Sequence, residues 1–283
     1  MIERLTFTLV GSSWPTYNYW QMKKVDLTLV KHSVKVGDEC DDIEPNVTED
    51  CLLYDGDDLI GFYIRDIRKY SMPLYNALGI ANKEFRSKRV PKATMTRSSA
   101  LNARREGGKG VEQYSTIIGS IPPKPHMRRA YPTRSSVHDV RSADMFVKAM
   151  IMACKHSENL IKLLAPSIYD NQRQIISDNV PLKWRFGELF TSSISNFNIA
   201  SAFHVDTANL KGCVNVILTK RNSSSGGNTT VPDYDATFYS DDNSMLVYPA
   251  WRNIHGVTPI KAHNDGGYRN SLVFYPLKAF NVK

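Results

Sequence analysis

The chain has 283 residues, of which 42% are hydrophobic and 23% are charged, so it can bury a sizeable core and has the composition of a globular protein. No apolar run approaches the roughly 18 residues of a membrane-spanning helix. The N-terminus lacks the apolar stretch of a signal peptide, which favours a cytoplasmic protein without a membrane partner. The four cysteines form no CxxC pair and are expected to stay reduced.

The net charge of +8 is unevenly distributed along the chain. Residues 38–58 contain ten acidic residues and no Lys or Arg, whereas residues 83–134 contain thirteen Lys or Arg and three acidic residues. A basic stretch of this density suits a polyanion such as a nucleic acid. A solvated loop explains the charge alone equally well.

Residues 1–82 are predicted to form a β-rich N-terminal extension that packs on the rest of the chain. Its β-rich runs lie at 5–10, 25–30 and 59–67, and the acidic stretch between them resembles a surface insertion. Residues 83–134 lack hydrophobic periodicity and are rich in Arg, Lys, Ser, Gly and Pro. We therefore expect this basic segment to be mostly loop.

Two helices are predicted over the supporting segment 142–179. Apolar residues recur at helical spacing from Ser142 to Leu164, Pro166 ends this first helix, and a shorter helix follows over 167–179. We expect both helices to cover one face of a sheet.

After Pro181 the sequence changes to short β-rich runs separated by turn residues. The predicted strands are 190–198, 202–205, 213–219, 236–239, 245–248 and 271–275. Strands this short and numerous indicate a sandwich or barrel rather than a parallel α/β sheet. We therefore predict an α+β, mainly β fold with a barrel over 190–277, inside a core domain over 83–283 that forms one compact unit with the N-terminal extension.

A candidate metal site begins at His204-Val205-Asp206. This motif is common by chance, but residues i and i+2 of a strand point to the same face, so both side chains can reach one metal. His255 lies forty-nine residues after Asp206 and completes a set of two histidines and one carboxylate. Such a set leaves positions open on one side of Fe(II) for a bidentate keto acid and O2.

Arg269 follows His255 by fourteen residues, and Ser271 lies on the same face of the predicted strand. Arg offers planar bidentate recognition of a carboxylate, as the far end of 2-oxoglutarate requires, and Ser271 can add a hydroxyl hydrogen bond. Each residue taken singly also fits a plainer role, such as a structural His, a solvated Asp or a surface Arg. The complete order of these residues in a β-rich half is much harder to obtain by accident. Motifs of serine hydrolases, P-loop proteins, dinucleotide-binding folds and zinc proteases are absent.

Around these residues the sequence resembles the TET/JBP family of DNA-base dioxygenases, and within it the bacteriophage members. The resemblance covers roughly residues 95–277. Its motifs are Phe190-Thr191-Ser192, Asn196-Phe197-Asn198, His204–Asn209, Gly226-Gly227, Pro232-Asp233-Tyr234, the strand from Ser244 to Tyr248, His255–Pro259 and Arg269-Asn270-Ser271, with Tyr131–Ser136 upstream in the basic segment.

The resemblance implies a double-stranded β-helix, a jelly-roll core of the cupin type, with flanking helices. It implies that His204, Asp206 and His255 hold Fe(II) and are the catalytic residues. It also implies that 2-oxoglutarate is the cosubstrate, held by Arg269 and Ser271, and that O2 is the oxidant.

The implied substrate is DNA with a methylated pyrimidine flipped out of the duplex. Asn209, Arg134 and Asn198 are the residues expected to contact it, although a turn Asn with a backbone bond explains Asn209 equally well. The expected reaction converts 5-methylcytosine into 5-hydroxymethylcytosine and further oxidised forms. No obligate protein partner is implied, and a phage-encoded protein would act in the host cytoplasm.

Three alternatives remain open. A thymine dioxygenase would form 5-hydroxymethyluracil in DNA, and the amide of Asn209 can pair with the edge of either base. Hydroxylation of a protein or a small molecule is possible because this barrel supports many reactions. A non-catalytic DNA-binding module is the third, and the intact ligand set disfavours it.

Overall fold

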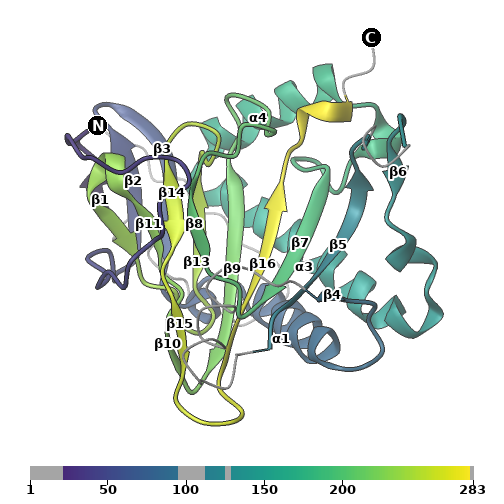
Figure 1. Cartoon of the computed structure of the whole chain (residues 1–283). Helices are drawn as coiled ribbons and strands as arrows, with labels where there is room; N and C mark the ends of the chain where they lie inside the picture. The colour runs from purple at the N-terminus through teal and green to yellow at the C-terminus, as the bar shows by residue number, and fades with distance from the viewer. Residues whose placement is uncertain (1–21, 95–111, 125–128, 281–283) are drawn as a thin grey trace.

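The computed structural model describes residues 22–94, 112–124 and 129–280. A ten-stranded sheet runs through the protein (Figure 1). Its strands, in spatial order, are β1 (Lys23–Asp26), β2 (Cys51–Asp55), β3 (Asp58–Ile64), β13 (Met245–Tyr248), β9 (Asn215–Asn222), β16 (Tyr268–Tyr275), β7 (Ser192–Phe197), β5 (Tyr114–Ile121) and β4 (Ala93–Thr94), with β6 (Thr133–Arg134) paired to β5. The pairs are antiparallel except β1 with β2.

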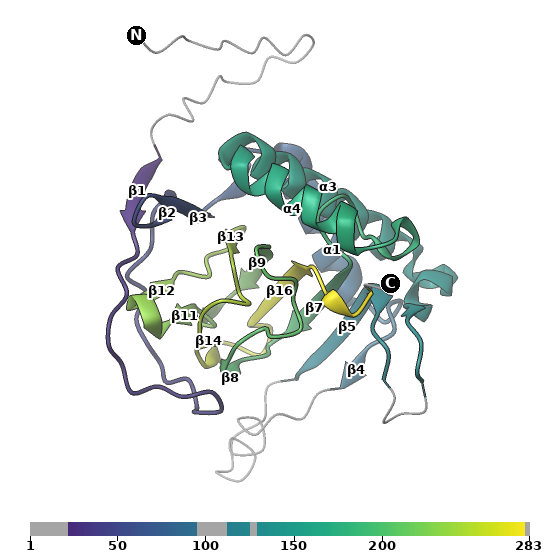
Figure 2. The same cartoon turned by 90° about the horizontal axis from the view of Figure 1, so that it is seen from above.

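A smaller sheet faces the middle of the large one. Its strands, in spatial order, are β12 (Ala236–Phe238), β11 (Thr229–Val231), β14 (His255–Val257) and β8 (Ser201–His204). Figure 2 shows it opposite β13, β9, β16 and β7, on the side away from the helices. A third pair is formed by β10 (Ser224–Gly226) and β15 (Ile260–Ala262). The two facing sheets form the predicted double-stranded β-helix, a mainly β core with flanking helices, which leaves a cavity between its layers.

Three helices cover the other face of the large sheet (Figure 2). They are α1 (Met72–Arg86), α3 (Asp144–Leu164) and α4 (Pro166–Asn179). The two predicted helices are confirmed as α3 and α4. Among the described residues, no helix combines the length and the apolarity that crossing a bilayer requires.

Short 3-10 turns join these elements: Ile67–Lys69, Ser136–Asp139, Arg141–Ala143, Leu182–Trp184, Pro232–Tyr234 and Lys278–Phe280. Aromatic side chains fill the core beneath the helices. The ring of the fully buried Phe274 lies 5.9 Å from that of Phe190 and 6.1 Å from that of Phe186. All four cysteines are buried and unpaired, as expected.

Helix α1 was not predicted, and the expectation of short strands and loops there is wrong. Ser71 caps it by accepting a hydrogen bond from the Leu74 amide, but its buried face depends on Ala77 and Ala81 beside a few larger residues. Small residues give a weak periodic signal, because alanine is apolar without being diagnostic of burial.

Strand β5 contradicts the expectation of loop over most of 83–134. Its sequence, YSTIIGSI, is almost entirely buried although half of it is Ser, Thr or Gly, so neither alternation nor a long apolar run marks it. The strand expected at 25–30 ends at Asp26, and the one expected at 59–67 ends at Ile64. The strand expected at 5–10 lies outside the described residues.

Candidate functional site

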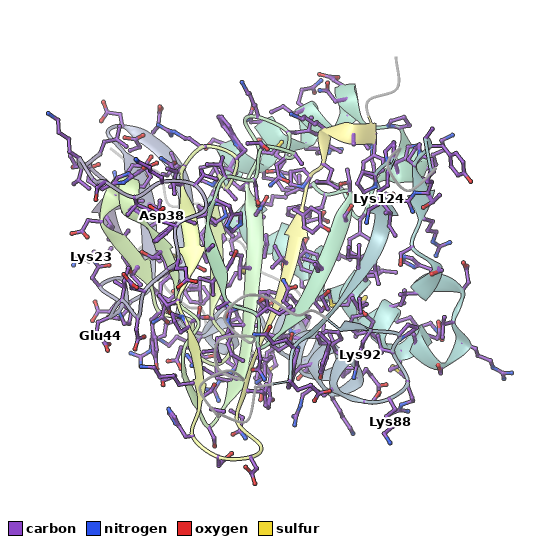
Figure 3. All side chains as sticks on the ribbon, in the orientation of Figure 1. Lys23, Asp38, Glu44, Lys88, Lys92 and Lys124 are labelled. Carbon is purple, nitrogen blue, oxygen red and sulfur yellow. The ribbon has the colours of Figure 1, made fainter. Side chains whose placement is uncertain are left out.

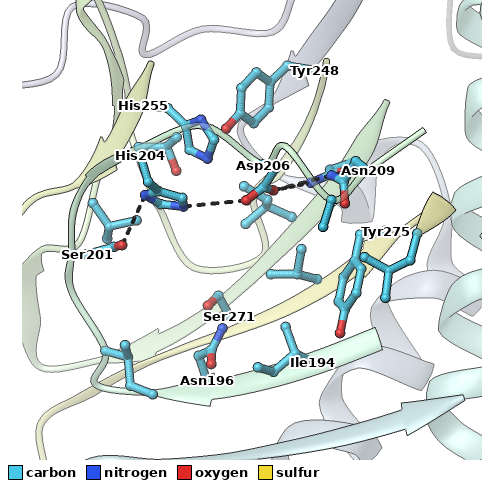
Figure 4. Close-up of a pocket in the computed structure, with 18 of the residues that line it drawn as sticks. Ile194, Asn196, Ser201, His204, Asp206, Asn209, Tyr248, His255, Ser271 and Tyr275 are labelled. Carbon is cyan, nitrogen blue, oxygen red and sulfur yellow. Dashed lines mark hydrogen bonds and ion pairs between the residues drawn. The ribbon is translucent and has the colours of Figure 1, made fainter. Parts of the chain in front are cut away.

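A cavity of about 310 Å³ lies between the two facing sheets. It is lined by strands of both sheets and by the loop that follows β8 (Figure 4). Six of the predicted site residues line it: His204, Asp206, Asn209, His255, Arg269 and Ser271. Residues far apart in the sequence therefore meet in one space.

The pairing of β8 with β14 brings the two histidines together. His204 ends β8, His255 begins β14, and the two are direct partners in the antiparallel register. Their rings lie 4.3 Å apart, and His204 Nε2 lies 3.6 Å from Asp206 Oδ1. One ligand atom from each of the three residues lies within 4.8 Å of the others, a spacing that can hold a metal ion.

Backbone carbonyls set the tautomer of both imidazoles. His204 Nδ1 donates to the Ala202 carbonyl at 2.8 Å, and His255 Nδ1 donates to the Asn253 carbonyl at 3.1 Å. Each ring therefore presents the lone pair of Nε2. Burial, and secondarily the neighbouring His204, lowers the pKa of His255 to about 4, which keeps this imidazole neutral. A free Nε2 lone pair is what metal ligation by a histidine requires.

Two amides orient the carboxylate of Asp206. Asn215, at the start of β9, donates from Nδ2 to Asp206 Oδ2 at 2.9 Å. Asn209 Nδ2 lies 2.9 Å from Asn215 Oδ1 and 3.4 Å from Asp206 Oδ2. Because Oδ2 is held in this way, Oδ1 is the oxygen that faces the histidines (Figure 4).

Arg269 also lines the cavity and is only 2% exposed. Its Nη2 donates to Ser240 Oγ at 3.3 Å, while its Nε has no hydrogen-bond partner among the described residues. Burial, and secondarily the charge of Arg221, lowers the pKa of Arg269 to about 9. A buried cation with a free donor fits an anionic ligand in the cavity. Ser271, two residues on and on the same strand face, lines the cavity as well.

Glycine keeps the space beside Arg269 open. Gly227 has a φ of +68°, and a Cβ built there would lie 3.1 Å from Arg269 Cδ and 3.2 Å from its Nε. The donor set of two imidazole nitrogens and one carboxylate oxygen fits Fe(II), and the buried Arg269 fits the far carboxylate of 2-oxoglutarate.

The predicted substrate contacts fall in three different places. Asn209 lines the cavity, and its amide nitrogen is directed to Asn215 and Asp206. Asn198 does not line it; its side-chain oxygen accepts from the Arg269 backbone amide at 2.8 Å and its nitrogen donates to the Glu112 carbonyl. Arg134 is exposed on β6, away from the cavity lining. Their contact with a substrate stays a prediction.

Six polar residues of the cavity wall were not predicted: Asn196, Ser201, Asn215, Thr229, Tyr248 and Tyr275. The Asn196 side-chain oxygen and the Tyr248 hydroxyl are buried without a hydrogen-bond partner among the described residues. Tyr248 and Tyr275 end two strands that were predicted, but β13 and β16 are buried along nearly their whole length, so no alternation marks the residues that face the cavity. Nothing local in the sequence marks Asn215, because its role depends on a contact with the loop after β8.

Comparison with known proteins identifies the family. The family model Tet_JBP, described as the oxygenase domain of the 2OGFeDO superfamily, matches residues 122–278. The chain is similar to the structure of NgTET1 in complex with 5mC DNA, with a TM-score of 0.56 and 13% identity, covering 90% of this chain and 86% of that chain. No curated protein matches the chain.

Two further solved structures align with the chain. An oxidoreductase of the 2OG-Fe(II) oxygenase family from Burkholderia pseudomallei has a TM-score of 0.43 and 12% identity, covering 79% of this chain and 88% of that one. A full-length Neurospora crassa protein in complex with alpha-KG has a TM-score of 0.40 and 11% identity, covering 76% of this chain and 74% of that one. Because the Tet_JBP model matches more than half of the sequence, the chain belongs to the Tet_JBP family of oxygenases, which use Fe(II), 2-oxoglutarate and O2.

Proposed function

We propose that this protein is a DNA dioxygenase that hydroxylates the 5-methyl group of 5-methylcytosine to give 5-hydroxymethylcytosine. The observation that carries the proposal is a single cavity that contains both a set of two histidines and one carboxylate and the buried Arg269, whose Nε has no hydrogen-bond partner among the described residues. The alternative substrate is thymine, which would give 5-hydroxymethyluracil.

The chain's own residues perform binding, orientation and exclusion of water. His204, Asp206 and His255 would hold Fe(II), and Arg269 with Ser271 would hold the far carboxylate of 2-oxoglutarate. When bound, the metal and its cosubstrate supply the oxidising power for hydroxylation by O2. The walls between these groups are largely apolar, including Ile194, Ile199, Ile217, Val257 and Val273. Such walls keep bulk water from the reacting methyl group and strengthen the electrostatic contacts inside.

The charge distribution supports a DNA substrate. Lys88, Lys92 and Lys124 lie on the side of the protein where β4, β5 and β6 form the sheet edge, whereas Asp38 and Glu44 lie on the opposite side together with Lys23 (Figure 3). Phosphates would be attracted to the basic side and repelled from the acidic side, which orients a duplex. Family membership and the likeness to a protein bound to 5mC DNA support the same assignment.

The decisive experiment compares two DNA duplexes that differ only in carrying 5-methylcytosine or cytosine at one position, each with ordinary thymines. After incubation with Fe(II), ascorbate and 2-oxoglutarate, the DNA is digested and its nucleosides are measured by mass spectrometry. The proposal expects 5-hydroxymethylcytosine from the methylated duplex alone. Accumulation of 5-hydroxymethyluracil instead would establish the thymine alternative.

Variants separate chemistry from folding. His204→Ala and Asp206→Ala should abolish both the oxidised base and succinate release. The matched control is His263→Ala, because His263 is exposed and contacts Ser225 rather than the cavity; it should keep full turnover. Succinate release without an oxidised base would indicate a protein or small-molecule substrate. DNA binding without any succinate would indicate a non-catalytic module.

A further inference from the structure

A second arginine lies directly behind Arg269. Arg221 on β9 is the register partner of Arg269 on β16. Their exposed fractions are 9% and 2%, so two guanidinium groups are buried side by side on neighbouring strands. Burying like charges in adjacent cross-strand positions is unfavourable unless something compensates them.

The contacts of Arg221 are neutral. Its Nη1 donates to the Ser240 carbonyl at 2.7 Å, and its Nη2 donates to the Gly226 carbonyl at 3.1 Å. Ser240 also accepts from Arg269 through its hydroxyl, so one residue holds both guanidinium groups in place. Arg221 itself does not line the cavity.

Carboxylates do not neutralise the pair. Asp242 accepts from the backbone amide of Arg221, and Asp241 and Asp242 lie near enough to favour its charge. However, no ion pair within 4.0 Å joins either arginine side chain to an acidic residue in the described part of the chain. The free Nε of Arg269 is therefore available to pair with a carboxylate of a ligand in the cavity.

We propose that Arg221 is a positioning residue that adds a second positive charge behind Arg269 and thereby makes the cavity select 2-oxo dicarboxylic acids over 2-oxo monocarboxylic acids. The inference rests on the proposed cosubstrate role of Arg269. Arg221 acts through Arg269: Ser240 fixes the spacing of the two groups, and the distal carboxylate of the ligand lowers the repulsion between them.

Binding measurements without DNA test this inference. The affinity of the metal-loaded protein for 2-oxoglutarate is compared with that for 2-oxobutyrate, which has the same oxo-acid end and no distal carboxylate. Arg221→Met removes the charge and keeps most of the side-chain volume. It should weaken the binding of 2-oxoglutarate by about tenfold or more, because unit charges buried on neighbouring strands interact strongly. It should leave the binding of 2-oxobutyrate nearly unchanged. Arg221→Lys should retain most of the discrimination.

The matched control is Arg185→Met. Arg185 also donates to backbone carbonyls, those of Val180 and Ser177, but lies outside the cavity lining. It should bind both acids as the wild type does. Equal weakening of both acids in Arg221→Met, or no weakening of either, would overturn the inference. A wild type that binds neither acid would instead contradict the proposed role of Arg269.

Arg221→Gln, which keeps one amide donor for Ser240 or Gly226, serves if Arg221→Met does not fold. If neither neutral variant folds, competition in the wild type decides. Sulfate should displace 2-oxoglutarate but bind together with 2-oxobutyrate, because only 2-oxoglutarate has a distal carboxylate that would occupy the anion site at Arg269. Failure of sulfate to displace 2-oxoglutarate would contradict the proposed role of Arg269 and, with it, the inference that rests on that role.

Discussion

Replacing Asn215 with alanine removes the amide that holds the second oxygen of Asp206. Asn215 is 3% exposed, and its Nδ2 lies 2.9 Å from Asp206 Oδ2. A hydrogen bond to a charged group contributes roughly 1.5–3 kcal/mol, which corresponds to a loss of about 10- to 150-fold in an equilibrium that depends on it. Partners that orient metal ligands typically account for about 10- to 100-fold of metal affinity. Asn215→Ala should therefore weaken Fe(II) binding by one to two orders of magnitude.

Calorimetric titration of the metal-free protein with Fe(II) under anaerobic conditions measures this loss directly, and Mn(II) provides a check that is insensitive to oxidation. Asn209→Ala should have a smaller effect, because its amide is 3.4 Å from the same carboxylate oxygen. Asn171→Ala is the control, since that amide donates to the Gly212 carbonyl and not to a candidate ligand. A folded Asn215→Ala protein with wild-type Fe(II) affinity would refute the reasoning.

Three further predictions concern other contacts in the same protein. Gly227→Ala should raise the KM for 2-oxoglutarate severalfold in steady-state assays, because the new methyl group would crowd the Arg269 guanidinium at a backbone φ of +68°; an unchanged KM would show that Arg269 does not hold the cosubstrate. Burial raises the pKa of Glu158 from its ordinary 4.5 to about 7, so the folded protein retains a proton that the unfolded chain releases. The contribution of the protonated Glu158 to stability is complete below pH 4.5 and is lost as the pH rises to about 7, which lowers the free energy of unfolding by roughly 3 kcal/mol at most. Urea unfolding at a series of pH values should show this decrease in the wild type and not in Glu158→Gln. Phe274→Ala should lower the free energy of unfolding by about 3–5 kcal/mol, because it empties a fully buried site between Phe186 and Phe190; a loss below about 1 kcal/mol in the same unfolding assay would contradict that packing.

Local patterns in the sequence were enough to predict the elements that carry the candidate ligands. His204 ends a strand that a short β-rich run predicted, whereas Asp206, expected on the same strand, lies in the loop after it. Arg269 and Ser271 repeat the one-residue spacing on another strand, whose predicted start was Ser271. Helix α3 has a wide apolar stripe, and Pro166, the first residue of α4, marks where one helix ends and the next begins, so this boundary was also predictable. In each case the signal lies within a few residues of the feature.

Features that depend on distant contacts were not predictable in this way. The register that makes His204 and His255 direct partners joins strands about fifty residues apart, and no local pattern encodes it. No local pattern marks Asn215 either, because its amide donates to Asp206 only when β9 lies beside the loop after β8. Asn198 was expected from motif likeness to contact the substrate, which stays a prediction; its contact with the Arg269 backbone was not predictable from local sequence.

The position of β16 has a consequence for how the molecule is made. This strand is the last in the described part of the chain, yet it lies between β9 and β7 in the middle of the large sheet and carries Arg269. During synthesis, β7 and β9 must therefore wait with unpaired edges until their shared neighbour emerges from the ribosome. Such late, long-range pairing slows folding and exposes edges that can associate with other chains. The end of the cavity that carries Arg269 is thus among the last parts to form.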